Sequence, residues 1–217
     1  MRNLAAATMV FVSGFVIMVL EVVGTRWLAP FFGSSFEVWV SQIGLVLVAL
    51  GLGYFLGGAV ADRGGRLLWL AWLLWLAGVF IYAIPVAGNF LVSLIVNRHP
   101  VDVPIPPLWL KLDPVIGSAV VFLVPCAVLA MLSPFFIRLA ARSLAQVGRA
   151  SGLIFAASTA GSIAGVFISG FVLIEYMTVS RIFNVMGAAT ILLGLACLAL
   201  DGFLSPAGRA PAAGAPR

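Results

Sequence analysis

Charged residues are scarce in this chain: they make up 9% of its 217 residues, whereas about a quarter of an ordinary soluble domain is charged. The mean hydropathy is +1.20 and 63% of the residues are hydrophobic, which excludes a soluble globular protein. Apolar runs of about 20 residues, the length that a helix needs to cross a bilayer, follow one another with charges mainly in the breaks. We therefore expect an all-α integral membrane protein.

Histidine and cysteine are also rare, because the chain has only His99, Cys126 and Cys197. Both cysteines fall inside apolar runs and no second histidine is present, so we expect no metal site and no catalytic triad. The glycines lie within the spans rather than in a phosphate-binding loop, so we expect no cofactor. No catalytic residues stand out, and we do not expect this chain alone to be an enzyme.

Six membrane spans are expected, at about residues 5–27, 38–60, 67–88, 114–136, 150–173 and 182–200. Residues 89–113 are expected to form a long outer loop that begins with an interfacial segment. The sequence predicts a transmembrane domain over residues 1–200 and a disordered cytoplasmic tail over 201–217, which is low in complexity.

The basic residues predict the orientation of the chain in the membrane. With a cytoplasmic N-terminus, eight of them lie inside and four outside, in agreement with the positive-inside rule. The inner ones are Arg2, Arg63, Arg66, Arg138, Arg142, Arg149, Arg209 and Arg217, and the outer ones are Arg26, Arg98, Lys111 and Arg181. We expect a multi-pass protein of the plasma (inner) membrane with both termini in the cytoplasm. The net charge of +5 is explained by the basic residues that set this orientation, so no nucleic-acid partner is expected.

The two halves of the chain share a pattern that predicts an internal repeat. APFF at 29–32 is echoed by SPFF at 133–136, and each stands at the end of a span. The spans that follow share Gly44 with Gly152, Gly53 with Gly161 and Gly57 with Gly165. Because each half has three spans, the halves would have opposite orientations, as in many transporters. Chance recurrence of small residues is the alternative.

Four charged residues are candidates for binding a solute at the outer side: Glu21, Arg26, Glu37 and Glu175. Glu21 lies well inside the first span, where a carboxylate is costly unless it is paired, neutralised or in contact with water. Arg26 is five residues further on and lies on a different face of the helix, so each needs a partner on another helix. Three carboxylates at one mouth would favour a cationic solute. The alternative is a structural charge network, with Arg26 reaching the headgroups.

The loop GGAVADRGGR contains Asp62, Arg63 and Arg66 in the pattern G-x-x-x-D-R-x-G-R. This spacing resembles the loop between the second and third helices of major facilitator superfamily transporters, where it forms a cytoplasmic latch. The resemblance implies that these three residues gate the cytoplasmic side and that the six spans form half of a major facilitator fold. A loop that only sets the topology is the alternative.

Small residues on the second and fifth spans predict faces for close helix packing. In major facilitator-like folds these two helices of each half meet the other half, so the resemblance implies a homodimer. The residues expected at the dimer interface are Gly44, Gly51, Gly53, Gly57, Gly58, Gly161 and Gly165.

Four stretches carry a second resemblance: EVVGTRWLAPFFGSS at 21–35, LGLGYFLGGAVADR at 50–63, SPFFIRL at 133–139 and VGRASGLIFAASTAGSIAG at 147–165. Together they resemble the membrane domain of spermidine synthase-like proteins, the fused major facilitator/spermidine synthase family. The matching positions are Glu21, Arg26, Pro30, Gly33, Asp62, Arg63 and Arg149.

This resemblance implies a half-transporter-like protein that binds or translocates a small, polyamine-like cation. Many members of the family continue into a soluble synthase domain, and we expect none in this chain. A synthase reaction would therefore need a separate soluble subunit as partner. The alternative is a membrane anchor for such a subunit, with no transport.

Overall fold

The computed structural model describes residues 2–64, 66–99, 105–140 and 147–204, and within these ranges the chain folds into helices joined by short turns. Six helical segments of the described residues are long and apolar enough to cross a membrane, as in a multi-pass membrane protein. They are Leu4–Phe32, Phe36–Asp62, Leu67–Val96, Pro107–Ala140, Val147–Tyr176 and Val179–Asp201. The predicted tail begins inside the last helix, and residues 205–217 lie outside the described ranges.

Some of these spans are single helices and others are divided. The first, second and sixth spans are α1 (Arg2–Phe32), α2 (Phe36–Asp62) and α10 (Val179–Leu204). The third, fourth and fifth contain five-residue π-helical segments, which often mark functional sites. The third is α3 (Leu67–Ala83), η1 (Ile84–Gly88) and α4 (Asn89–Val96). The fourth is α5 (Pro107–Ser118), η2 (Ala119–Leu123), α6 (Val124–Ala130) and α7 (Leu132–Ala140). The fifth is α8 (Val147–Ile168), η4 (Ser169–Leu173) and α9 (Ile174–Tyr176).

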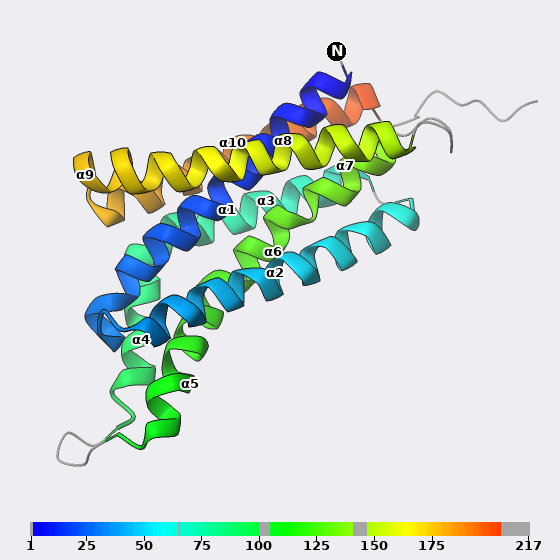
Figure 1. Cartoon of the computed structure of the whole chain (residues 1–217). Helices are drawn as coiled ribbons and strands as arrows, with labels where there is room; N and C mark the ends of the chain where they lie inside the picture. The colour runs from blue at the N-terminus through cyan, green and yellow to red at the C-terminus, as the bar shows by residue number, and fades with distance from the viewer. Residues whose placement is uncertain (1, 65, 100–104, 141–146, 205–217) are drawn as a thin grey trace, which may run out of the picture.

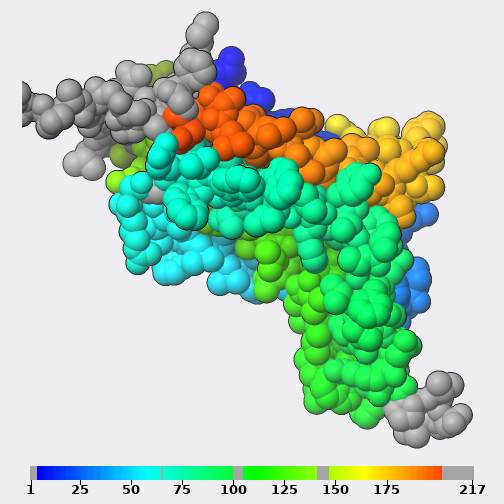
Figure 2. Space-filling model, turned by 180° about the vertical axis from the view of Figure 1, so that it is seen from behind, coloured from blue at the N-terminus to red at the C-terminus, as the bar shows by residue number. Residues whose placement is uncertain are grey.

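The six spans pack mainly in three pairs. The first packs on the fifth through α1 and α8, the third on the sixth through α3 and α10, and the second on the fourth through α2 and α5–α7. In Figure 1, α8 crosses in front of α1, and α6 lies between them and α2. Seen from behind, α3 and α10 cover the opposite face (Figure 2). We call the end with the turn at Gly33 the Gly33 end, and the end with the turn before α3 the Arg66 end.

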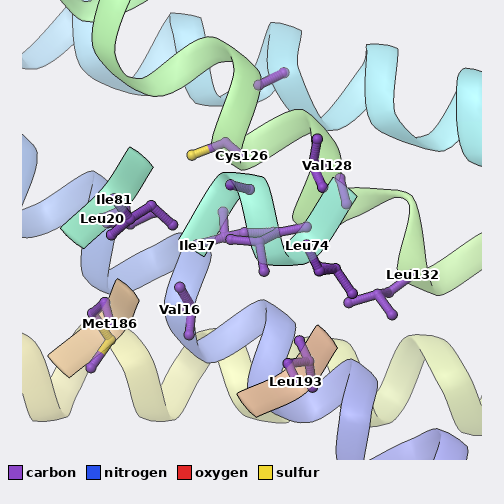
Figure 3. Close-up of a cluster of buried hydrophobic side chains, with 14 of the residues drawn as sticks. Val16, Ile17, Leu20, Leu74, Ile81, Cys126, Val128, Leu132, Met186 and Leu193 are labelled. Atoms are coloured by element: carbon purple, nitrogen blue, oxygen red, sulfur yellow. The ribbon is translucent and has the colours of Figure 1, made fainter. Parts of the chain in front are cut away.

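Apolar side chains from five helices meet in the middle of the bundle (Figure 3). Val16 and Leu20 of α1 lie among side chains of α3, α6, α7 and α10 there. Leu20, Leu74 and Cys126 are completely buried. The same core therefore connects all three pairs of spans.

Glycines bring the backbones of all three span pairs into direct contact, and in the pair of α3 and α10 a Cβ at Gly187 would lie 2.7 Å from the carbonyl oxygen of Gly78. A Cβ at Gly161 would lie 2.0 Å from the carbonyl oxygen of Phe11, and one at Gly165 would lie 2.6 Å from that of Phe15. In the second pair, a Cβ at Gly53 would lie 2.3 Å from the carbonyl oxygen of Ala127. Only glycine permits such approaches, because real Cβ atoms do not come this close to a carbonyl oxygen.

These contacts correct part of the predicted dimer interface. Gly53, Gly57, Gly161 and Gly165 are buried against other spans of the same chain and do not face a second copy. Gly44, Gly51 and Gly58 differ, since a Cβ on Gly44 or Gly51 would meet nothing within 4 Å and one on Gly58 would only touch Pro134 at 4.0 Å. The dimer role of these three stays a prediction.

The third and fourth spans continue beyond the predicted boundaries. The spans expected at 67–88 and 114–136 are Leu67–Val96 and Pro107–Ala140, so most of the predicted outer loop is helical. Their 30 and 34 residues correspond to about 45 and 51 Å of helix, well beyond the ~30 Å of hydrocarbon. At η1 and η2 the chain leaves the bundle, and α4 and α5 form an arm at the Gly33 end (Figures 1 and 2).

The contact between α1 and α8 leads to a first prediction. Gly161→Ala should lower the stability of the folded protein by about 1–3 kcal/mol, because the added methyl group forces the two helices apart. Gly152→Ala in the same helix is the matched control, since its Cβ meets nothing within 4 Å and alanine favours a helix over glycine. Thermal unfolding of both variants in the same detergent measures the difference. Equal unfolding temperatures would contradict a close contact between Gly161 and α1.

Candidate functional site

Glu21 lies close to the middle of the first span. The midpoint of Leu4–Phe32 is residue 18, so Glu21 is about 4.5 Å from it along the helix axis. Glu21 thus lies well inside the span, as the sequence predicts, and α1 extends beyond the expected end at residue 27 to Phe32. The side chain is half-buried and forms no hydrogen bond or ion pair within the described ranges. The structure therefore places a carboxylate with no partner among the described residues near the middle of the first span.

Polar groups that sequence reasoning missed lie against α1 at Leu20 and Gly24. Ser118 of α5 donates a hydrogen bond of 2.5 Å to the side-chain oxygen of Gln42, and the amide nitrogen of Gln42 donates to the carbonyl oxygen of Leu20 at 3.4 Å. Gln42 and Ser118 are completely buried. Gly24 makes room for them, because a Cβ there would lie 2.6 Å from the Gln42 amide nitrogen. We call Gln42, Ser118 and the carbonyl group of Leu20 the Gln42 node. Its hydrogen bonds join the first, second and fourth spans.

The four predicted solute-binding residues do not form one site. Arg26 is exposed and lines a pocket of about 420 Å³ together with Thr25, Ser34 and Trp39. Glu37 lines a different pocket, and neither of these pockets includes Glu21 or Glu175. Glu175 is exposed on α9. The acidic outer mouth that the sequence predicts is therefore not assembled in the structure, and Glu21 is the one of the four that lies deep in the bundle.

The predicted gating loop makes ion pairs with two other spans at the Arg66 end. Asp62 accepts a hydrogen bond from Arg138 of α7, and Arg66 pairs with Asp201 of α10 at 3.3 Å. Gly64 has a positive φ of 75°, which lets the chain turn sharply between the two. Arg63 is exposed and has no ion-pair partner among the described residues. The loop thus connects the second and third spans to the fourth and sixth.

A second charged cluster closes the arm at the Gly33 end. Asp113 of α5 is buried and pairs with Arg98 and with His99, whose Nε2 lies 2.7 Å from the carboxylate. Arg98 also lies over the ring of Trp109, 4.1 Å from its centre. His99 had no predicted role, and its role here is structural, because it holds the end of α4 against α5.

No group in the described part of the chain has the composition of a metal centre, since no three His, Cys, Asp or Glu side chains come together there. Cys126 and Cys197 are both buried and form no disulfide. The features that distinguish this interior are thus Glu21 and the Gln42 node.

Comparisons with known proteins add no relative: no family model, no curated protein and no solved structure matches this chain. The resemblance to spermidine synthase-like membrane domains therefore rests on the sequence motifs alone.

The Gln42 node leads to a second prediction. Ser118→Ala should destabilise the protein by about 1 kcal/mol, because it leaves the buried side-chain oxygen of Gln42 without a donor. Adding Gln42→Leu should recover part of this loss, since the unpaired group is removed as well. Ser93→Ala is the matched control, as the Ser93 hydroxyl bonds only within its own helical segment. Unfolding temperatures that fall equally for Ser118→Ala and Ser93→Ala would show that the node contributes nothing.

Proposed function

We propose that this protein is a half-transporter-like membrane protein that binds or translocates a small, polyamine-like cation and acts as a homodimer. The observation that carries the proposal is the position of Glu21, half-buried near the middle of the first span without a partner in the described chain. A charged side chain at the bilayer centre is costly and by default marks a solute or ion pathway. A cationic solute would supply the missing counter-charge.

The arrangement of the spans supports an inverted repeat of three-plus-three helices. Exchanging the two halves replaces the first span by the fourth, the second by the fifth and the third by the sixth. Under this exchange the pair of the first and fifth spans becomes the pair of the fourth and second spans, which is also observed. The pair of the third and sixth spans becomes itself. The observed set of pairs is thus the same before and after the exchange, as an inverted repeat requires.

The glycine contacts agree with the repeat in kind but differ in register. In each half, a G-x-x-x-G pair of the second helix packs on the first helix of the other half, through Gly53 and Gly57 or Gly161 and Gly165. If APFF at 29–32 corresponds to SPFF at 133–136, then residue 11 corresponds to residue 115. In the structure Phe11 lies opposite Gly161, but the residue opposite Gly53 is Ala127 and not residue 115. The halves would therefore be related with a shift of three helical turns at this contact.

Burial of the spans supports pairing of two copies through the second and fifth. These two are the least buried of the six candidate spans. They also lie on the face turned to the viewer in Figure 1. A second copy on this face would cover the exposed sides of α2 and α8.

The ion pairs at the Arg66 end support the gating role of Asp62 and Arg66. Asp62 and Arg138 are both more than half exposed, and exposed ion pairs contribute only about 0–1 kcal/mol. Such pairs can hold the ends of the second and fourth spans together and still separate easily when the bundle opens.

The third prediction tests Glu21 directly. Glu21→Gln should weaken spermidine binding at least tenfold, a loss of about 1.4 kcal/mol, because the amide carries no charge for the ammonium groups. Glu21→Asp retains the charge and should bind more tightly than Glu21→Gln. Binding and uptake of labelled spermidine by the full chain in proteoliposomes measure the effect, and an equal unfolding temperature shows that the fold is intact.

Unchanged spermidine binding in Glu21→Gln would remove Glu21 from the mechanism. If, in addition, wild-type proteoliposomes take up no spermidine and a soluble synthase-like protein co-purifies in equal amounts, the chain is a membrane anchor for that protein.

The fourth prediction tests the dimer. A cysteine in place of Leu47, which is exposed on α2, should give a crosslinked dimer in native membranes. Leu192→Cys, exposed on α10 at the opposite face, is the control and should give none. The two native cysteines are buried and do not compete. Crosslinks that form equally at both positions, or at neither, would contradict pairing through the second span.

A further inference from the structure

A groove of about 540 Å³ separates α2 from α5 of the arm. It runs along α2 from Glu37 to Val48, and Lys111 and Val115 of α5 line its other side. Apart from Glu37 and Lys111, the side chains that face it are almost all apolar. We call it the α2–α5 groove.

The groove has the depth of one leaflet of a bilayer. The midpoint of α2 is residue 49, so Glu37 lies about 18 Å from the centre of the membrane and Val48 almost at the centre. The hydrocarbon of one leaflet is about 15 Å thick, which places Glu37 at the level of the headgroups. An acyl chain that lies in the groove from Glu37 to Val48 would span its whole leaflet.

Two opposite charges stand at the mouth of the groove without forming an ion pair. The carboxylate of Glu37 interacts mainly with its own backbone N–H and with Ser35, and more weakly with the positive charge of Lys111; no ion pair joins Glu37 and Lys111, and both side chains are exposed. A separated pair of this kind matches a headgroup that itself carries both charges. Its phosphate would contact Lys111 and its ammonium group would contact Glu37.

Gly44 keeps the groove open halfway down. A Cβ at this position would meet nothing within 4 Å, so glycine is not required there by contact with another helix. Its missing side chain instead leaves space between Val40 and Val48, which line the same wall one turn to either side.

We propose that the α2–α5 groove binds one zwitterionic phospholipid, with an acyl chain along Gly44 and the headgroup between Lys111 and Glu37. A phospholipid with a primary ammonium group, such as phosphatidylethanolamine, satisfies both charges, whereas phosphatidylglycerol satisfies only Lys111. The groove does not include Glu21, so this lipid would bind at a different place from the proposed solute.

The fifth prediction is tested by native mass spectrometry of the delipidated full chain, to which phosphatidylethanolamine or phosphatidylglycerol is added back. The wild type should retain phosphatidylethanolamine more strongly. Gly44→Leu should abolish this retention, because the leucine fills the groove without a clash within the chain. Gly152→Leu, at an equally open glycine of α8, is the matched control and should behave as the wild type.

Charge variants at the mouth separate the two contacts. Lys111→Gln should weaken retention of both lipids about fivefold, the change that corresponds to about 1 kcal/mol for one basic residue at a membrane surface. Glu37→Gln should remove the preference for phosphatidylethanolamine and leave binding of phosphatidylglycerol unchanged. Both residues are exposed, so neither substitution threatens the fold.

Equal retention of the two lipids by the wild type, or equal retention by Gly44→Leu and Gly152→Leu, would overturn the proposal. A dimer that Gly44→Leu disrupts while lipid retention stays unchanged would also overturn it, because a second copy would then occupy the groove.

Discussion

Direct contact between the backbones of neighbouring spans is the constraint on which this bundle depends. Lipid chains are as apolar as leucine, so burial of apolar side chains alone does little to hold helices together in a membrane. Close packing has to replace it, and Gly161 on Phe11, Gly53 on Ala127 and Gly187 on Gly78 provide that packing, one contact in each of the three pairs. The Gln42 node adds a hydrogen-bonded connection between three spans at a point where no water can compete.

Much of the architecture could be predicted from the sequence, because hydropathy reports directly on the number of spans. All six are present, and the boundaries were wrong mainly at the third and fourth. The sequence prediction assumes about 20 residues for each span, the length that crosses the hydrocarbon. The third and fourth spans are longer, because their helices continue through η1 and η2 into the arm. Glycine spacing predicted close packing correctly, but one sequence does not tell whether the neighbouring helix belongs to the same chain. The structure assigns Gly53 and Gly161 to contacts within the chain.

The site was less accessible to prediction, since it depends on which polar groups meet across helices. Glu21 could be found from its position alone, because a lone carboxylate in an apolar run is unusual. Gln42 could have been noticed in the same way, because it is a polar residue inside the apolar run VWVSQIGLVLVAL. The role of Ser118 is visible only in the structure, where its hydroxyl donates a hydrogen bond to Gln42. The pairing of Asp113 with Arg98 and His99 across the arm likewise depends on how α4 and α5 meet, which the sequence does not show. Several charges near the ends of spans thus join neighbouring helices, whereas Glu21, near the middle of its span, has no ion-pair partner among the described residues.

The arm has a consequence for the surrounding bilayer. The fourth span contains 34 residues and the sixth 23, so the length of helix that faces the lipid differs strongly around the circumference of the protein. Adjustment to such a mismatch costs a fraction of a kcal/mol for each Å, either by bending of the helix or by deformation of the lipid. The bends at η1 and η2 take up part of it, and the lipid beside the arm takes up the rest. A membrane that fits this molecule is therefore thicker on one flank than on the other, and the lipid composition around it becomes uneven.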